Sequence, residues 1–196
     1  MAKYLDSTAL AEMNQARLQI FAIRAEIYRN YQIDVLDTDA LSALSIHEIV
    51  SQYDSDYNIN FSRNGEDAIS NGVLIEQKAT RVAGALTKTG KPRKNADADA
   101  GFQFHAMGDI EHERYIFVAR KKDDLSVIRM YDISTKSNCQ IIINYLKQER
   151  ANWLAKGQTN TAQMKRDIIS ISERFIKQKL NLSAPTIISG CAVYKD

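Results

Sequence analysis

Residues 65–78 read GEDAISNGVLIEQK, a pattern that predicts a β-hairpin turning at Asn71 and Gly72. A two-residue type I′ turn needs a positive φ angle at both central positions, and Asn and Gly tolerate this better than other residues. A turn of this length fixes the register of the two strands, and that register sets Asp67 directly opposite Glu76. Residues opposed in this way have Cβ atoms only about 5 Å apart. The hairpin therefore predicts a pair of adjacent carboxylates.

Two opposed carboxylates destabilise a strand pair unless an opposite charge compensates them. A divalent cation would do so, because Mg²⁺ in proteins is typically held by one or two carboxylates together with phosphate and water. The two-residue period of a strand also places Lys78 on the same face as Glu76. We therefore expect Asp67 and Glu76 to bind Mg²⁺, with Lys78 beside them.

A solvated surface hairpin is the simpler alternative, in which Lys78 only neutralises Glu76. The continuous apolar run Val73-Leu74-Ile75 argues against it, because such a run predicts a strand that is covered on both faces. A carboxylate pair buried beside such a strand would be costly without a cation. The sequence thus favours the cation site.

An acidic residue on one strand followed by Glu-x-Lys on the next resembles the PD-(D/E)xK nuclease superfamily. Asp67 matches the first acid of that motif, and Glu76-Gln77-Lys78 matches its second half. The chain departs from the family pattern in two respects, because Glu66 replaces the proline and the spacer between the two acids is short.

The resemblance in motif covers roughly residues 63–80, and the order of the elements extends it loosely to about residue 150. Within the superfamily, this order looks most like that of type II restriction endonucleases with a small chain, an N-terminal helical region and a histidine-bearing segment downstream. The resemblance implies a restriction-endonuclease-like fold. It also implies an enzyme, a type II site-specific deoxyribonuclease that uses Mg²⁺ to hydrolyse phosphodiester bonds of double-stranded DNA at a short sequence.

In such an enzyme the catalytic residues would be Asp67, Glu76 and Lys78, with Asp67 and Glu76 as the metal ligands. Lys78 would stabilise the charge that builds on the phosphate, and would help to orient or deprotonate the attacking water. Glu66 falls on the opposite face of the hairpin by strict alternation. It could join the site only if the strand bulges or twists, so we expect it to lie next to the metal ligands without binding the ion. Two alternatives remain, a structure-directed or repair nuclease with the same site and a non-catalytic DNA-binding domain.

The segment that follows the second hairpin strand is basic and contains no acidic residue up to Lys94. Gly84, Gly90 and Pro92 break any regular element there, so the segment predicts a loop. A basic loop beside a metal site suits a polyanion such as DNA, although an ordinary solvated loop has the same composition. The candidate DNA contacts in and next to this loop are Arg81, Lys88, Lys91, Arg93, Lys94 and Asn95.

A histidine-bearing segment lies further downstream and contains Gln103 and His105. The comparable segment of the resembled enzymes reads bases, and Gln can pair with adenine while a neutral His can donate or accept one hydrogen bond. Gln103 and His105 are therefore candidate DNA-binding residues. A satisfied or exposed histidine without a site role is the alternative for His105, and more strongly so for His112.

The rest of the chain predicts helices around a mixed sheet. Apolar residues at helical spacing predict a long helix over residues 6–31 and a second one that begins near 38, or at the capping box 45–48, and ends near 53. Strand-forming residues predict strands near 59–61, 102–105, 115–119 and 127–131, and apolar stripes predict helices over 137–155 and 161–180. The predicted class is α/β (α+β), a central mixed β-sheet flanked by helices.

These elements predict a single domain, residues 1–196, with three regions. They are a helical N-terminal and dimerisation region (1–55), a catalytic sheet with its DNA-contacting loop (56–135) and C-terminal helices (136–196). Cleavage of both strands of a duplex needs two sites related by a dyad, so we expect a homodimer. The N-terminal helix carries more apolar surface than one stripe requires and is the candidate interface, with packing against the sheet as the alternative.

The composition is that of an ordinary globular protein, with 26 Lys and Arg against 24 Asp and Glu and a net charge of +2. A charge so close to zero neither establishes nor excludes DNA binding. No apolar run approaches the roughly 18 residues that span a bilayer and the N-terminus lacks a signal-peptide pattern, so we expect a cytoplasmic protein with no membrane partner. Cys139 and Cys191 lack metal-ligand spacing and predict buried, reduced thiols.

Overall fold

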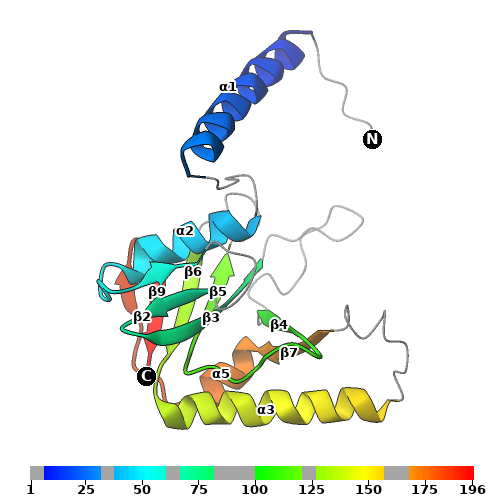
Figure 1. Cartoon of the computed structure of the whole chain (residues 1–196), viewed down its shortest axis with the longest axis vertical. Coiled ribbons are helices and arrows are strands. Elements are labelled where there is room, and N and C mark those ends of the chain that lie inside the picture. The colour runs from blue at the N-terminus through cyan, green and yellow to red at the C-terminus, as the bar shows by residue number, and fades with distance from the viewer. Residues whose placement is uncertain (1–6, 32–37, 61–66, 82–99, 121–126, 157–167) are drawn as a thin grey trace. The chain divides into compact units, whose positions relative to one another are not determined.

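The computed structural model describes residues 7–31, 38–60, 67–81, 100–120, 127–156 and 168–196. The chain forms two compact units, Met1–Ala43 and Leu44–Asp196. Helix α1 (Ser7–Tyr31) is the main element of the first unit, and helix α2 (Thr38–Val50) begins in the first unit and ends in the second (Figure 1). None of the described helices combines the length and the apolar character that crossing a membrane requires.

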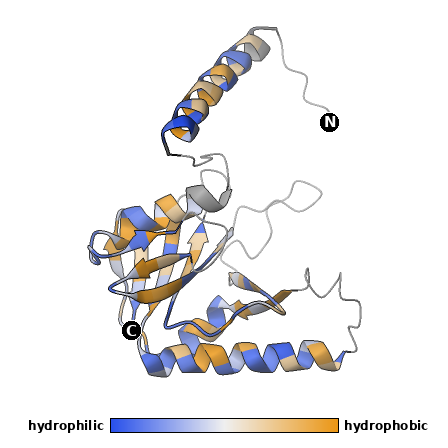
Figure 2. Cartoon of the chain, viewed as in Figure 1, coloured by the Kyte–Doolittle hydropathy of each residue, from blue (hydrophilic) through white to orange (hydrophobic). Residues whose placement is uncertain are grey.

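Helix α1 carries large apolar side chains on more than one side, as its mixed colouring in Figure 2 shows. Leu18 and Ile20 are both exposed although they are two positions apart, which puts them on nearly opposite sides of a helix. The large apolar residues exposed on this helix are Met13, Leu18, Ile20, Phe21, Ile23 and Tyr28. Taken by itself, the first unit therefore presents apolar surface that it does not bury.

The second unit is built on a seven-stranded mixed sheet in the order β1-β2-β3-β5-β6-β9-β8. Strands β3 and β5 are parallel, as are β6 and β9, and the other neighbours are antiparallel. A separate antiparallel ribbon consists of β4 and β7. The strands are β1 (Asn58–Ile59), β2 (Ala68–Ser70), β3 (Val73–Arg81), β4 (Gly101–His105), β5 (Arg114–Arg120), β6 (Val127–Ile133), β7 (Ile168–Ser172), β8 (Thr186–Ile188) and β9 (Cys191–Lys195).

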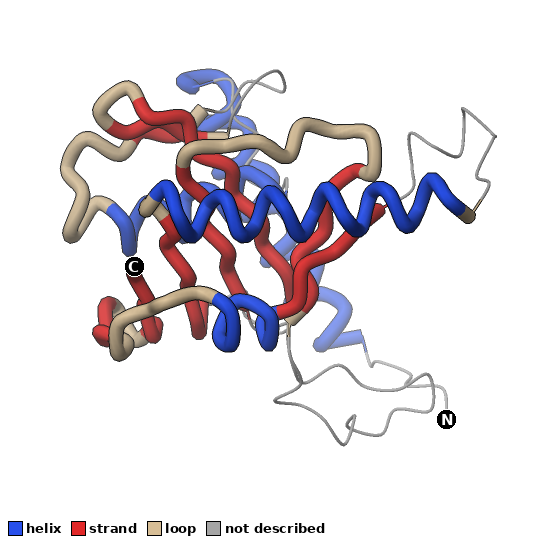
Figure 3. The backbone as a smooth tube through the Cα atoms, turned by 90° about the horizontal axis from the view of Figure 1, so that it is seen from below, coloured by secondary structure: helices blue, strands red, loops and turns tan. Residues whose placement is uncertain are grey.

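Strand β5 is the centre of the core, because all seven of its residues are buried. On one face, Tyr115 and Phe117 join the core that includes the β4–β7 ribbon and helix α3 (Lys136–Ala155), which crosses the strands in Figure 3. On the other face, Ile116 and Val118 join the core that includes the C-terminal half of α2. Helix α5 (Glu173–Lys179) follows β7 directly and adds Ile176 to the first core.

The predicted hairpin is confirmed. Asn71 and Gly72 have φ angles of 50° and 82°, as a type I′ turn requires. The strand pairs run from Ser70–Val73 to Ala68–Ile75, which is the register that the two-residue turn predicts. The class prediction is also confirmed at the level of a mixed α/β protein with a central mixed sheet and helices.

The prediction that the Val73–Ile75 run is covered on both faces is wrong. Ile75 is fully buried, but Leu74 is 40% exposed and its cross-strand partner Ile69 is 41% exposed. The register explains the difference, because Ile75 pairs with Arg114 at the first residue of β5. Leu74 thus lies beyond the start of the neighbouring strand and of the core that packs on it.

The predicted helix over 161–180 is wrong where the structure describes it. Residues Ile168–Ser172 form strand β7, and only Glu173–Lys179 form a helix, while 161–167 lie outside the described residues. Ile169 and Ile171 alternate as buried residues and pair with Phe104 and Phe102 of β4. Isoleucines separated by three residues fit a helical stripe. The β-branched run is nevertheless more stable as a strand that pairs with β4, which is distant in the chain.

The prediction of a purely helical C-terminal region is also wrong, because β8 and β9 form a hairpin there and complete the sheet. Its turn contains Ser189 and Gly190, both with positive φ angles, of 47° and 78°. This dipeptide between apolar residues is a turn signal that the sequence already contains. The predicted buried thiols are confirmed, and burial raises the pKa of both Cys139 and Cys191 to about 12.

Candidate active site

Three charged side chains meet where the β2–β3 hairpin joins the sheet. The ammonium of Lys78 contacts Glu76 Oε1, and its Nζ lies 3.8 Å from Asp67 Oδ2. The last pair of the β2–β3 ladder is Ala68–Ile75. Asp67 and Glu76 occupy the next position on each strand, so they lie across from each other. The predicted convergence of two carboxylates and one ammonium on a single face is therefore present.

Gln77, the central residue of the Glu-x-Lys motif, holds this arrangement together. Its backbone N–H donates to Asp67 Oδ2 over 2.7 Å, which fixes the first acid against the second strand. Its side chain points to the opposite face and donates through Nε2 to the hydroxyl of Tyr57, which is buried against α2. The motif is thus anchored through both faces of β3.

The two carboxylates differ in their environments. The side chain of Glu76 is only 13% exposed, against 43% for Asp67. Burial raises the pKa of Glu76 above its ordinary value and the charge of Asp67 adds to the rise, while Lys78 and His112 act in the opposite direction. Any added positive charge at this point would therefore stabilise the ionised form of Glu76.

The donor atoms fit a hard divalent ion, because two carboxylates on adjacent strands are ligands that Mg²⁺ accepts. Within the described ranges, no three His, Cys, Asp or Glu side chains are grouped closely enough to enclose an ion. The ammonium of Lys78 lies between the two carboxylates instead. An ion at this place would have to compete with that ammonium for Glu76.

A pocket of about 510 Å³ opens beside these charges. Glu76 and Lys78 line it together with Gln103 and His105, whose side chains are on the exposed face of the β4–β7 ribbon. The Lys78 ammonium lies 5.4 Å from the centre of the Phe104 ring on the same ribbon. Two of the predicted DNA-binding residues thus line the same pocket as Glu76 and Lys78.

The other predicted site residues cannot be placed in this way. Arg81 is the last residue of β3, but its side chain is not among those described. The remaining candidates lie outside the described residues, and they are Glu66, Lys88, Lys91, Arg93, Lys94 and Asn95. Their predicted roles stay predictions.

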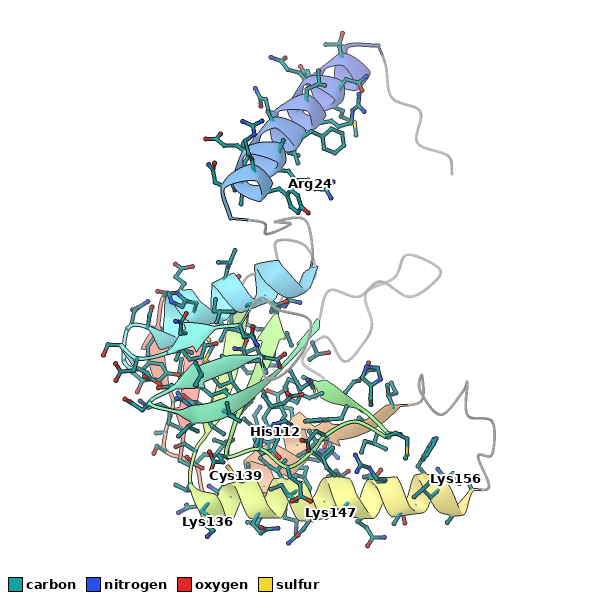
Figure 4. The ribbon with its side chains drawn as sticks, in the orientation of Figure 1. Arg24, His112, Lys136, Cys139, Lys147 and Lys156 are labelled. Atoms are coloured by element: carbon teal, nitrogen blue, oxygen red, sulfur yellow. The ribbon has the colours of Figure 1, made fainter. Side chains whose placement is uncertain are left out.

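His112 is a residue of the site that the sequence did not indicate. Its Nε2 lies 3.7 Å from Glu76 Oε2, and its side chain is only 7% exposed. Figure 4 labels this residue among the side chains of the second unit. The residue lies three positions before Tyr115, and Tyr115 pairs with Glu76 in the parallel ladder of β3 and β5. Only a correct prediction of this long-range parallel pairing would have placed His112 at the site.

A larger pocket of about 780 Å³ also has His112 in its wall. Three of its charged groups are paired with one another, because Arg114 donates two hydrogen bonds to Asp132, of 2.7 and 2.8 Å, and a third to Asp54. Tyr53 adds a hydrogen bond of 2.8 Å to the same Asp132 carboxylate. This network ties the end of α2 to strands β5 and β6, which is a structural role.

No protein-family model matches this chain. Comparison with curated proteins also gave no match. The function is therefore argued from the geometry of the site alone.

Proposed function

We propose that this protein is a Mg²⁺-dependent nuclease, a type II restriction endonuclease with a restriction-endonuclease-like fold that acts on DNA in the cytoplasm. The observation that carries the proposal is the meeting of Asp67, Glu76 and Lys78 on one face of a confirmed hairpin. A surface ladder would leave both acids in water, whereas Glu76 is largely buried at the wall of a pocket. Burial of an acid without a function would only cost stability.

Each residue of the site has a separate task in the proposed reaction. Asp67 and Glu76 would hold the cation, which when bound supplies a Lewis acid that activates water and polarises the phosphate. Lys78 reaches the pocket across the Phe104 ring, so its ammonium can donate to the phosphate oxygens as their charge grows. Gln77 keeps Asp67 in place through its backbone N–H.

The β4–β7 ribbon supports the choice of duplex DNA as the substrate. A two-stranded antiparallel ribbon fits the major groove, where the edges of the base pairs can be distinguished. Gln103 and His105 lie on its exposed face and line the same pocket as Glu76 and Lys78. A base read by the ribbon would thus lie close to the bond that is cut, and the basic segment from Arg81 to Lys94 would add contacts to phosphate.

Incubation of a plasmid with the protein and Mg²⁺ tests the proposal. We expect a small number of discrete linear fragments, and no cleavage when EDTA removes the cation. Diffuse nicking, or cutting that follows DNA ends or shape, would instead identify a structure-directed or repair nuclease with the same site. Binding without any cleavage would identify a non-catalytic DNA-binding domain and would overturn the proposed activity.

We further propose that the protein acts as a homodimer through α1, because two cuts in a duplex need two sites related by a dyad. The Phe21→Glu substitution places a charge among the exposed apolar residues of this helix, where Phe21 is 45% exposed. Light scattering should then find the mass of one 22.2 kDa chain instead of two, and plasmid should be nicked and no longer linearised. Gln15→Glu, at a polar position of α1, should leave the dimer intact. A Phe21→Glu protein that remains dimeric would exclude this interface.

A further inference from the structure

The β4–β7 ribbon presents one defined face away from the core. Its other face is packed into the first core by four large residues, Phe102, Phe104, Ile169 and Ile171. Because side chains alternate along a strand, the residues between these four point to the opposite side. That side consists of exposed residues, which we call the ribbon face: Gly101, Gln103, His105, Ile168 and Ser170. The buried pairs thus fix which side chains the ribbon can offer to a partner.

Ile168 is the large apolar residue of the ribbon face. It is 46% exposed, whereas the other two isoleucines of β7 are almost completely buried. In the antiparallel register Ile168 pairs with His105, and Gln103 is its diagonal neighbour on β4. Directly opposed residues have Cβ atoms about 5 Å apart, and diagonal neighbours are about 7–8 Å apart. An exposed apolar side chain therefore lies within reach of both predicted base readers.

The place of Ile168 distinguishes it from other exposed apolar residues. A single isoleucine on a protein surface needs no functional explanation, and Ile187 on β8 is an example with 68% exposure. Ile187 lines neither of the two pockets described above. Ile168 lines the pocket of about 510 Å³ together with Glu76 and Lys78. A ligand of the proposed active site would therefore meet this apolar side chain.

The end of the ribbon that carries Ile168 is held by helix α3. The backbone N–H of Gly108 donates to the carbonyl of His105 over 3.0 Å, and Arg150 of α3 donates to the carbonyl of Gly108. A side chain at position 108 would have little room, because a Cβ there would lie 3.2 Å from the Cβ of His105. The turn after β4 thus fits closely against the cross-strand partner of Ile168.

The major-groove edge of an A·T pair offers both a polar and an apolar partner. Adenine presents N7 and its N6 amino group, which a Gln amide can bind together, and thymine presents O4 and a C5 methyl group that apolar side chains contact. A G·C pair has no methyl group in this groove. The ribbon face offers the amide of Gln103 and, diagonally across from it, the apolar side chain of Ile168. Its chemistry therefore matches an A·T pair better than a G·C pair.

We propose that Ile168 is a specificity-determining residue that packs against the C5 methyl group of a thymine in the major groove, so that the sequence cut by the protein contains an A·T pair. The inference rests on the proposed function and names a feature of its substrate. The contact removes apolar surface of both groups from water, which favours thymine over a base without the methyl group. Gln103 would bind an adenine beside this contact.

Cleavage of DNA that contains uracil in place of thymine tests this inference, because uracil lacks only the C5 methyl group. Fragments that together span the plasmid are amplified with dTTP or with dUTP and are incubated with the full-length protein and Mg²⁺. Ile168→Ala removes most of the apolar side chain, and Ile168→Thr is a second variant that keeps the β-branched shape in case the first does not fold. Ile187→Ala is the matched control, because it shortens an exposed isoleucine on a strand outside the ribbon.

The unsubstituted protein should cut the uracil fragments about threefold to tenfold more slowly in kcat/KM than the thymine fragments, the effect of one methyl group lost from an apolar contact. Both Ile168 variants should cut the two kinds of DNA at equal rates, and Ile187→Ala should keep the preference. Sequencing of the cut ends should find an A·T pair among the base pairs that they share.

The failure of this inference can be told apart from the failure of the proposed function. Equal cutting of both kinds of DNA by the unsubstituted protein, or a shared sequence of G·C pairs alone, would overturn the role of Ile168 and leave the nuclease standing. A preference for thymine that both Ile168 variants retain would assign the methyl contact to another residue and would also overturn it. Absence of Mg²⁺-dependent cutting in either DNA would overturn the proposed function together with this inference.

Discussion

Replacement of Lys78 by Met is expected to slow DNA cleavage by about 10²- to 10⁴-fold, the range observed when an enzyme loses a charge-stabilising donor or a proton-transfer group. Met keeps most of the aliphatic chain that passes the Phe104 ring, so packing is largely preserved. Single-turnover cleavage of a plasmid measures the rate. If the hairpin were only a surface ladder, this substitution would not affect any reaction of DNA.

The same substitution should not weaken cation binding, and tighter binding is the expected direction. The ammonium of Lys78 contacts Glu76 and approaches Asp67, so it competes with any cation for both carboxylates. Glu76→Gln, in contrast, removes a ligand and should abolish both cleavage and tight cation binding. The dissociation constant of Mg²⁺, measured by titration, separates these two effects.

Lys147→Met is the matched control for Lys78→Met, because it removes the same charge from the exposed surface of α3. It should leave cleavage within about twofold of the unsubstituted protein. A Lys78→Met protein that cuts DNA at the normal rate would exclude Lys78 from the chemistry. Equal losses in both lysine variants would point to general DNA attraction instead of a site-specific role.

Replacement of Arg114 by Met is expected to lower the free energy of unfolding by about 3–5 kcal/mol, the cost of removing one partner from a buried ion pair. Arg114 is buried and donates to both oxygens of Asp132, which is itself only 4% exposed. Burial alone would lower the pKa of Arg114, but its bonds to Asp132 raise it, so the guanidinium stays charged. Without it, the Asp132 carboxylate would keep the hydrogen bond from the Tyr53 hydroxyl but would be a nearly uncompensated buried charge.

Urea denaturation followed by circular dichroism measures this loss, and a double replacement tests its cause. Arg114→Met combined with Asp132→Asn should recover much of the stability, because the second change removes the buried charge. Lys147→Met, whose ion pair with Glu111 is largely exposed, should cost less than about 1 kcal/mol. A loss below about 1 kcal/mol for Arg114→Met alone would contradict a central role for this network in the fold.

Local patterns predicted the parts of the fold that depend on neighbours in the chain. The β2–β3 hairpin follows from the turn chemistry of Asn71 and Gly72, and α3 follows from apolar residues at helical spacing over Lys136–Ala155. The prediction failed for Ile168–Ser172, where isoleucines three apart fitted a helix as well as a strand. Pairing with β4, more than sixty residues earlier in the chain, decides between them.

Some features of the candidate site could likewise be predicted from local patterns, and others depend on tertiary packing. Asp67, Glu76 and Lys78 belong to one hairpin, so strand alternation was sufficient to bring them to one face. Gln103 and His105 were predicted as DNA-binding residues only from the family resemblance. They line the pocket because the β4–β7 ribbon packs over the same face of the sheet. The unequal burial of the two acids, with Glu76 13% exposed and Asp67 43%, could not be predicted because it depends on this packing.

The β2–β3 hairpin is what the sequence determined by itself, since a two-residue turn acts only on residues that are adjacent in the chain and sets the strand pairs from Ser70–Val73 to Ala68–Ile75. The tertiary structure alone decided what surrounds it. The parallel pairing of β3 with β5 sets Glu76 beside Tyr115 and so brings His112 to the carboxylate. Contacts of this kind depend on the free energy of packing the whole core, which no local pattern of residues contains.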